Sequence, residues 1–174
     1  MRETILDAAE RRARNGGYNG FSFRDLANDV GIKSASVHYY FPTKEDLGEV
    51  LAQRYLERIS DRLGSPTNLS ARTAVRRLGD IFIEANETDN QMCLCGVLAA
   101  ESGNLPPRVA AKASAFFKFM HNWLEKALRS ADEAPRPEEI VAALEGGLLT
   151  ARITRDPAIL RSVVSATVKR VRPQ

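Results

Sequence analysis

Residues 33–40 bring together side chains whose sizes and polar groups suit contacts with nucleic acid. If the segment is helical, its outward positions carry small hydroxyls, an amine, an imidazole and two phenols, which can reach base edges in the major groove and phosphate oxygens. These outward residues are Lys33, Ser34, Ser36, His38, Tyr39 and Tyr40. A purely structural role is the alternative, with Tyr39 and Tyr40 as half-buried anchors and Ser34 only as an N-cap.

The residues just before this segment predict the first helix and the tight turn of a helix-turn-helix. Ser22 and Asp25 have the spacing of a capping pair, so a helix is expected to begin at residue 23. Gly31 can adopt the positive φ angle that a sharp turn between helices often needs. Val37 and Phe41 would then place the apolar side of the second helix inward, which leaves the polar residues outside.

The charge of the chain permits a nucleic-acid partner but does not demand one. Its 25 basic and 22 acidic residues give a formal net charge of +3 and a pI near 9.0. Residues 1–50 contain seven basic and eight acidic residues, a net charge of −1, so no basic stripe is evident there. The DNA-binding hypothesis therefore depends on residue types and spacing.

The rest of the chain indicates an all-α protein of about nine helices. Prolines fall between stretches of helical periodicity, where a missing N–H does no harm, and no segment predicts a strand. Residues 130–135 are the sole loose linker. The expected helices are 2–15, 23–29, 34–40, 44–63, 71–87, 93–102, 106–129, 137–152 and 157–171.

The order of motifs around the turn resembles the helix-turn-helix of the TetR family of bacterial transcriptional regulators. The similarity covers about residues 4–51, and its densest part is Phe23-Arg-Asp-Leu-Ala-Asn-Asp-Val-Gly-Ile-Lys-Ser-Ala-Ser-Val-His-Tyr-Tyr-Phe-Pro-Thr-Lys-Glu-Asp-Leu47. The resemblance implies an N-terminal DNA-binding domain, residues 1–47, and a helical ligand-binding and dimerisation domain, residues 48–174. It further implies a homodimeric repressor that binds palindromic operator DNA and is released by a small-molecule inducer, with no cofactor.

The resemblance also assigns roles to single residues. It implies that Lys33, Ser34 and Ser36 approach bases. Phosphate contacts are implied for Ser22, Tyr39, Tyr40, Thr43 and Lys44. Two residues depart from the family pattern, because tyrosine is usual at the position of His38 and a serine or similar N-cap is frequent at that of Lys33.

The C-terminal two-thirds carries a candidate ligand pocket and a candidate dimer interface. Aromatic and sulfur-containing side chains could line the pocket, although such a stripe equally suits a plain core. The candidate lining residues are Phe82, Cys93, Phe116, Met120 and Trp123. Small residues spaced four apart at 142–147 and an apolar row from Leu160 to Val171 suggest a four-helix dimer interface built from 137–152 and 157–171, with packing inside one chain as the alternative.

The two cysteines, Cys93 and Cys95, are too few for a disulfide-stapled scaffold and do not show the spacing of a zinc site, so no metal is expected. In a helix they would point apart, which disfavours a disulfide between them. The segment is similar to a Cys-Leu-x-Gly stretch in one TetR-like branch, which implies that Cys93 could sense electrophiles or oxidants. A buried cysteine that only fills the core is the alternative.

Two other function classes compete with the regulator. A small helical enzyme would use Glu101, Ser102 and His121, but no nucleophile elbow, carboxylate pair or phosphate loop frames them, so no catalytic residue is assigned. A ligand-binding protein without DNA binding is the second alternative. Since the sequence shows no export signal and no membrane span, a cytoplasmic location is expected.

Overall fold

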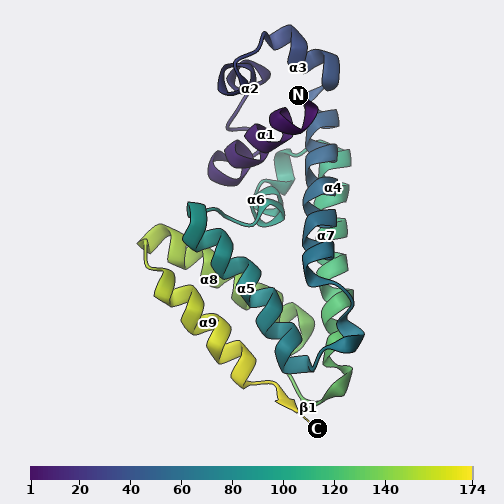
Figure 1. The fold of residues 1–174 in the computed structure, drawn as a ribbon, viewed down its shortest axis with the longest axis vertical. Helices are drawn as coiled ribbons and strands as arrows, with labels where there is room; N and C mark the ends of the chain where they lie inside the picture. Colours follow the sequence, from purple (N-terminus) through teal and green to yellow (C-terminus); the bar gives the residue numbers. More distant parts are fainter. Residues whose placement is uncertain (174) are drawn as a thin grey trace. The chain divides into compact units, whose positions relative to one another are not determined.

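The computed structural model describes residues 1–173, which form nine α-helices, three short 3₁₀ helices and one two-stranded ladder (Figure 1). The all-α class expected from the sequence is confirmed. The α-helices are α1 (Arg2–Gly16), α2 (Phe23–Val30), α3 (Ser34–Tyr40), α4 (Lys44–Leu63), α5 (Ala71–Asp89), α6 (Leu94–Ala100), α7 (Pro107–Ala127), α8 (Pro137–Thr154) and α9 (Pro157–Lys169). The 3₁₀ helices are Pro66–Asn68, Ser102–Asn104 and Leu128–Ser130.

The expectation that the chain contains no strand is wrong. Strand β1 (Ala131–Glu133), in the expected linker, pairs antiparallel with β2 (Arg172–Pro173) after α9. Segments of three and two residues are too short to show the alternation by which a strand is found in a sequence. Their pairing satisfies backbone groups between chain segments that are distant in sequence.

The chain packs as two compact units. The first consists of Met1–Arg58 and Leu94–Phe116, and the second of Ile59–Cys93 and Phe117 onward. The two units are defined by how the chain packs. The division at residue 47 expected from the sequence is a functional one, between a DNA-binding and a ligand-binding domain, and it stays a prediction.

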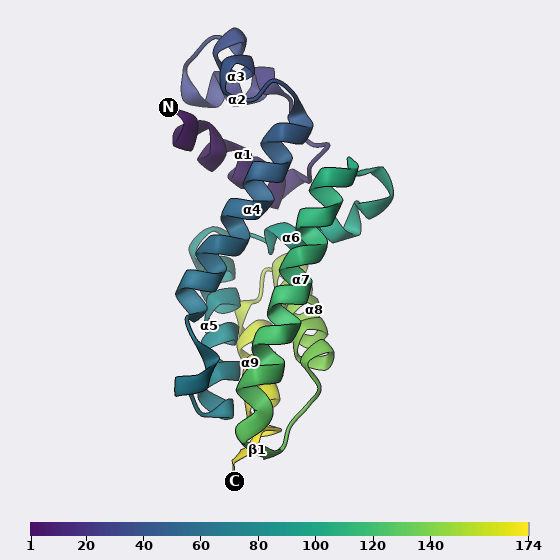
Figure 2. The ribbon, with the colours of Figure 1, turned by 90° about the vertical axis from the view of Figure 1, so that its right-hand side faces the viewer.

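Local signals in the first unit fix α1, α2 and α3, which are purple to blue in Figures 1 and 2. Ser22 and Asp25 form the expected capping box of α2, and Gly31 ends that helix at φ 72°. The side chain of Glu10 on α1 is buried and pairs with Arg14 on α1 and with Arg58 on α4. A buried carboxylate needs such partners, and the pair with Arg58 joins α1 to α4.

In the second unit, α5, α8 and α9 pack closely together (Figure 1). Val164 on α9 is 1% exposed and lies so close to Gly79 on α5 that an added Cβ there would approach it to 2.5 Å. A Cβ on Gly147 would lie 3.2 Å from Leu160 and from Val163. The sequence left open whether the apolar row of α9 forms a dimer interface or packs inside the chain. The buried residues of this row therefore pack inside the chain.

Candidate nucleic-acid interface

The structure places the predicted polar residues of α3 on its outer side. Val37 is fully buried and Phe41 is 2% exposed, so these two side chains anchor the helix. On the opposite side Tyr39 is 82% exposed. Exposed or half-exposed positions are occupied by Lys33, Ser34, Ser36, His38 and Tyr40. The helix therefore presents a continuous face of hydroxyl, amine, imidazole and phenol groups.

Two aromatic contacts fix side chains on this face. The ring of His38 meets Phe23 of α2 edge-on, with ring centroids 4.7 Å apart. Tyr39 and Tyr40 are likewise edge-on, at 5.2 Å. These contacts restrict the rings while leaving the polar atoms of exposed His38 and Tyr39 at the surface, which suits groups that must meet a partner in a fixed orientation.

The predicted phosphate ligands Ser22 and Thr43 use their hydroxyls to cap helices. Ser22 Oγ donates to Asp25 Oδ2 at 2.7 Å and accepts from the Asp25 backbone N–H. Thr43 Oγ1 and Asp46 form the same reciprocal pair at the start of α4. Since a phosphate oxygen only accepts hydrogen bonds, each hydroxyl would have to release its aspartate to bind one.

The predicted phosphate ligand Lys44 also has partners within the chain. Its Nζ donates to the carbonyl oxygen of Phe21 and lies 4.5 Å from the centroid of that ring. It lies 4.8 Å from the centroid of the Tyr18 ring. Burial lowers the pKa of Lys44, and the nearby carboxylates of Glu101 and Asp25 act in the opposite direction. The Lys44 amine therefore has partners within the first unit.

The sequence prediction missed two residues at this surface. Ala35 is exposed on α3, and Arg24 is exposed on the first turn of α2. Helical periodicity from Val37 points Ala35 outward, and Arg24 follows buried Phe23 by one position, so the same periodicity could have placed it at the surface. Arg24 is therefore an exposed cation at the start of α2 that the predicted set of DNA-binding residues lacked.

The candidate ligand-pocket residues are all buried. Phe116 lies in the first unit, where its ring is 5.5 Å from that of Tyr55. Trp123 lies in the second unit and donates from Nε1 to the Gly64 carbonyl oxygen at 2.7 Å. Phe82, Cys93 and Met120 also belong to the second unit. Burial agrees with a pocket and with a plain core, so this assignment stays a prediction.

A half-buried acid lies against Cys93. The carboxyl group of Glu145 on α8 hydrogen-bonds the Cys93 side chain, while its Oε1 atom has no hydrogen-bond partner among the described residues. Burial raises the pKa of Glu145 to about 7, and the bond to Cys93 partly offsets this rise. Neither Cys93 nor Cys95 forms a disulfide, and the sensing role of Cys93 stays a prediction.

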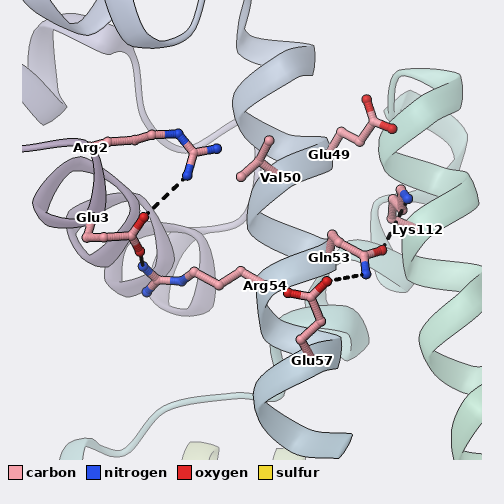
Figure 3. Close-up of a pocket in the computed structure, with 8 residues that line it drawn as sticks. All are labelled: Arg2, Glu3, Glu49, Val50, Gln53, Arg54, Glu57 and Lys112. Atoms are coloured by element: carbon pink, nitrogen blue, oxygen red, sulfur yellow. Dashed lines mark hydrogen bonds and ion pairs between the residues drawn. The ribbon is translucent and has the colours of Figure 1, made fainter.

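A groove of about 390 Å³ in the first unit differs from the expected aromatic pocket (Figure 3). Arg54 donates to Glu3 at 2.9 Å on one side, and Lys112 donates to Gln53 at 3.1 Å on the other. The groove is lined by Arg2, Glu3, Glu49, Val50, Gln53, Arg54, Glu57 and Lys112. Glu49 pairs with Arg108 outside the groove, and the other charged and amide groups pair with one another. The groove contains none of the predicted pocket residues.

Two of the three side chains considered for an enzyme have partners elsewhere in the chain. The Glu101 carboxylate accepts from the backbone N–H of Tyr18, and exposed His121 lies 3.6 Å from Glu138. Within residues 1–173 no group of three or more histidine, cysteine, aspartate or glutamate side chains is arranged to hold a metal ion. In the same range, every helix is too short or too polar to cross a membrane.

The geometry defines a class: a helix-turn-helix protein with a polar recognition helix, followed by a larger helical body. Residues 5–51 match the family model described as bacterial regulatory proteins of the tetR family. No match was found among curated proteins.

Solved structures extend the similarity over the whole chain. A TetR transcriptional regulator from Legionella pneumophila is 31% identical, covers 99% of this chain and 97% of its own, and has a TM-score of 0.91. A TetR-family regulator from Agrobacterium tumefaciens is 25% identical, with coverages of 98% and 97% and a TM-score of 0.90. The reduced form of Escherichia coli NemR, 19% identical with coverages of 99% and 98%, shares the fold at a TM-score of 0.81. The chain belongs to the TetR family of transcriptional regulators.

Proposed function

We propose that this protein is a homodimeric, cytoplasmic repressor that binds palindromic operator DNA and is released by a small-molecule inducer. The observation that carries the proposal is the outer face of α3, which is polar, exposed and rigidly anchored by buried Val37 in a TetR-family chain. Lys33, Ser34 and Ser36 would contact bases. Tyr39, Tyr40 and exposed Arg24 would contact phosphates.

A dimer is supported by an apolar stripe on α8. Leu149 is 59% exposed and Ile153 is 80% exposed, and their spacing of four residues puts them on one face of the helix. Ala142 and Gly146 are exposed on the same side of the helix, and a Cβ on Gly146 would meet nothing within 4 Å. A second copy packed on this stripe could approach closely at the small residues and cover the large ones.

Two DNA-binding domains are needed because one short recognition helix reads few base pairs. Two such domains related by a twofold axis read a palindrome, and the longer site raises sequence specificity without any new type of contact. An inducer would release DNA by binding more tightly to the conformation that cannot bind the operator.

Selection of bound duplexes from a random pool tests the proposal. The wild-type protein is expected to enrich a palindrome at low salt, whereas Tyr39→Ala should weaken retention of the selected duplex. Lys118→Ala, a change at an exposed residue of α7, serves as the matched control and should enrich the same palindrome. If the wild type enriches no sequence at low salt, the proposal is wrong and a ligand-binding protein without DNA binding is favoured.

A further inference from the structure

The loop between α1 and α2, residues 17–22, sets where the helix-turn-helix begins. It leads directly into the capping box of α2, so any shift of the loop moves the first turn of that helix. Within it, Tyr18 and Phe21 are 3% and 5% exposed. Such burial is unusual for a loop of this length and shows that other elements hold it.

The first element that holds the loop comes from a distant part of the sequence. Glu101 follows the last residue of α6, and its Oε2 atom accepts from the Tyr18 backbone N–H at 2.8 Å. A Cβ on Gly17 would lie 2.0 Å from Glu101 Oε1, so only glycine allows this approach. Gly17 also has a φ angle of +85°, which residues with a Cβ rarely adopt.

The second element is the start of α4. Lys44 donates to the Phe21 carbonyl oxygen and lies over the rings of Tyr18 and Phe21. Gly48, one turn later, lies close to Tyr18, since an added Cβ would lie 2.7 Å from the Cε2 atom of that ring. Burial and the nearby Glu45 carboxylate raise the pKa of Tyr18 to about 12, so the phenol stays neutral in this setting.

Glu101 is itself well fixed. Its backbone N–H donates to the carbonyl oxygens of Val97 and Leu98, and its own carbonyl accepts from Asn104 at 2.8 Å. The carboxylate also faces the Lys44 ammonium closely enough to oppose the effect of burial on the pKa of that amine. The loop is therefore held between an acid from the end of α6 and a base from the start of α4.

We infer that Glu101 and Lys44 are positioning residues for the DNA-binding surface: together they hold the α1–α2 loop and thereby set the first turn of α2. The inference rests on the proposed DNA-binding function and adds α6 to the machinery that supports it. It differs from the sequence prediction for Lys44, which would contact phosphate directly.

Hydrogen exchange tests the contact itself, without any DNA. Loss of an acceptor exposes the Tyr18 amide, so Glu101→Ala is expected to raise its exchange rate about ten-fold or more. Glu101→Gln should keep the wild-type rate because the amide oxygen still accepts the bond. Unchanged Tyr18 exchange in Glu101→Ala, with the overall unfolding stability retained, would overturn the inference.

Salt dependence on a random-sequence 30-base-pair duplex tests the role of Lys44. A phosphate ligand contributes about one unit per chain to the slope of log affinity against log salt. Lys44→Met, which keeps the aliphatic stem, is expected to weaken binding about ten-fold with the slope unchanged. Lys118→Met is the matched control and should alter neither quantity.

The outcomes separate the two proposals. A slope reduced by about one unit per chain in Lys44→Met makes Lys44 a phosphate ligand and overturns the positioning role. If the wild type binds neither this duplex nor any selected duplex, the proposed function fails, while the exchange measurement on Tyr18 still decides whether Glu101 holds the loop.

Discussion

Replacing Glu145 by glutamine should change how the stability of the protein depends on pH. Glutamine keeps the size of the side chain and removes its titration. The folded protein holds the Glu145 proton more tightly than the unfolded chain does, because burial raises the pKa of Glu145 from 4.5 to about 7. The stability that protonated Glu145 contributes is therefore fully present below pH 4.5 and is lost as pH rises through about 7.

The size of the effect follows from the pKa shift. One pKa unit corresponds to about 1.4 kcal/mol, so the full shift is worth about 3 kcal/mol. Between pH 5 and pH 8 the wild type should lose about 2 to 3 kcal/mol relative to Glu145→Gln. The Cys93 hydrogen bond limits this loss, since it favours the ionised carboxyl group.

Urea unfolding at a series of pH values measures this difference, with the protein concentration held fixed because a dimer gains stability by mass action. Glu125→Gln, at an exposed position of α7, is the matched control and should follow the wild-type curve at every pH. Parallel curves for the wild type and Glu145→Gln would refute the reasoning, because they would show that Glu145 titrates alike in the folded and unfolded states.

Three further predictions concern the surface, the interface and the thiols. Leu149→Asp should yield folded monomers in light scattering, whereas Val164→Asp should unfold the chain because that side chain packs inside it; a dimer of unchanged affinity in Leu149→Asp would remove α8 from the interface. Ser36→Ala should relax base preference at one half-site position in selected duplexes, and a uniform loss over all sequences would make Ser36 a positioning residue. If Cys93 senses electrophiles, iodoacetamide must alkylate it faster in the native protein than the equally buried Cys95, and equal rates would assign both to the core.

The helix-turn-helix could be predicted from the sequence because its signals are local. Ser22, Asp25 and Gly31 fix the bounds of α2 through a capping box and a left-handed turn, and both features appear where their spacing places them. Helix α3 also has the predicted bounds, Ser34–Tyr40. Such features depend on residues a few positions apart, which a periodicity argument can resolve.

The contacts that hold the site could not be predicted, because their partners are distant in sequence. Glu101 lies 83 positions from Tyr18, and a lone glutamate after a helix carries no sign of its acceptor role. Glu145 precedes exposed Gly146 and follows buried Leu144, so helical spacing leaves its own burial undecided. The apolar row of α9 predicted a buried face but could not choose between a partner subunit and α5.

The chain crosses the boundary between the two packing units at three points. The chain crosses it at Arg58–Ile59, at Cys93–Leu94 and at Phe116–Phe117, and the first and last crossings lie inside the continuous helices α4 and α7. The middle crossing joins Cys93, which Glu145 holds in the second unit, to α6, whose end holds the DNA-binding loop in the first. In the proposed function, an inducer would shift the equilibrium between two states only by its preference for one of them. Helix α6 is the shortest of the three helices at these crossings, and Glu101, directly after it, contacts the loop that precedes the helix-turn-helix.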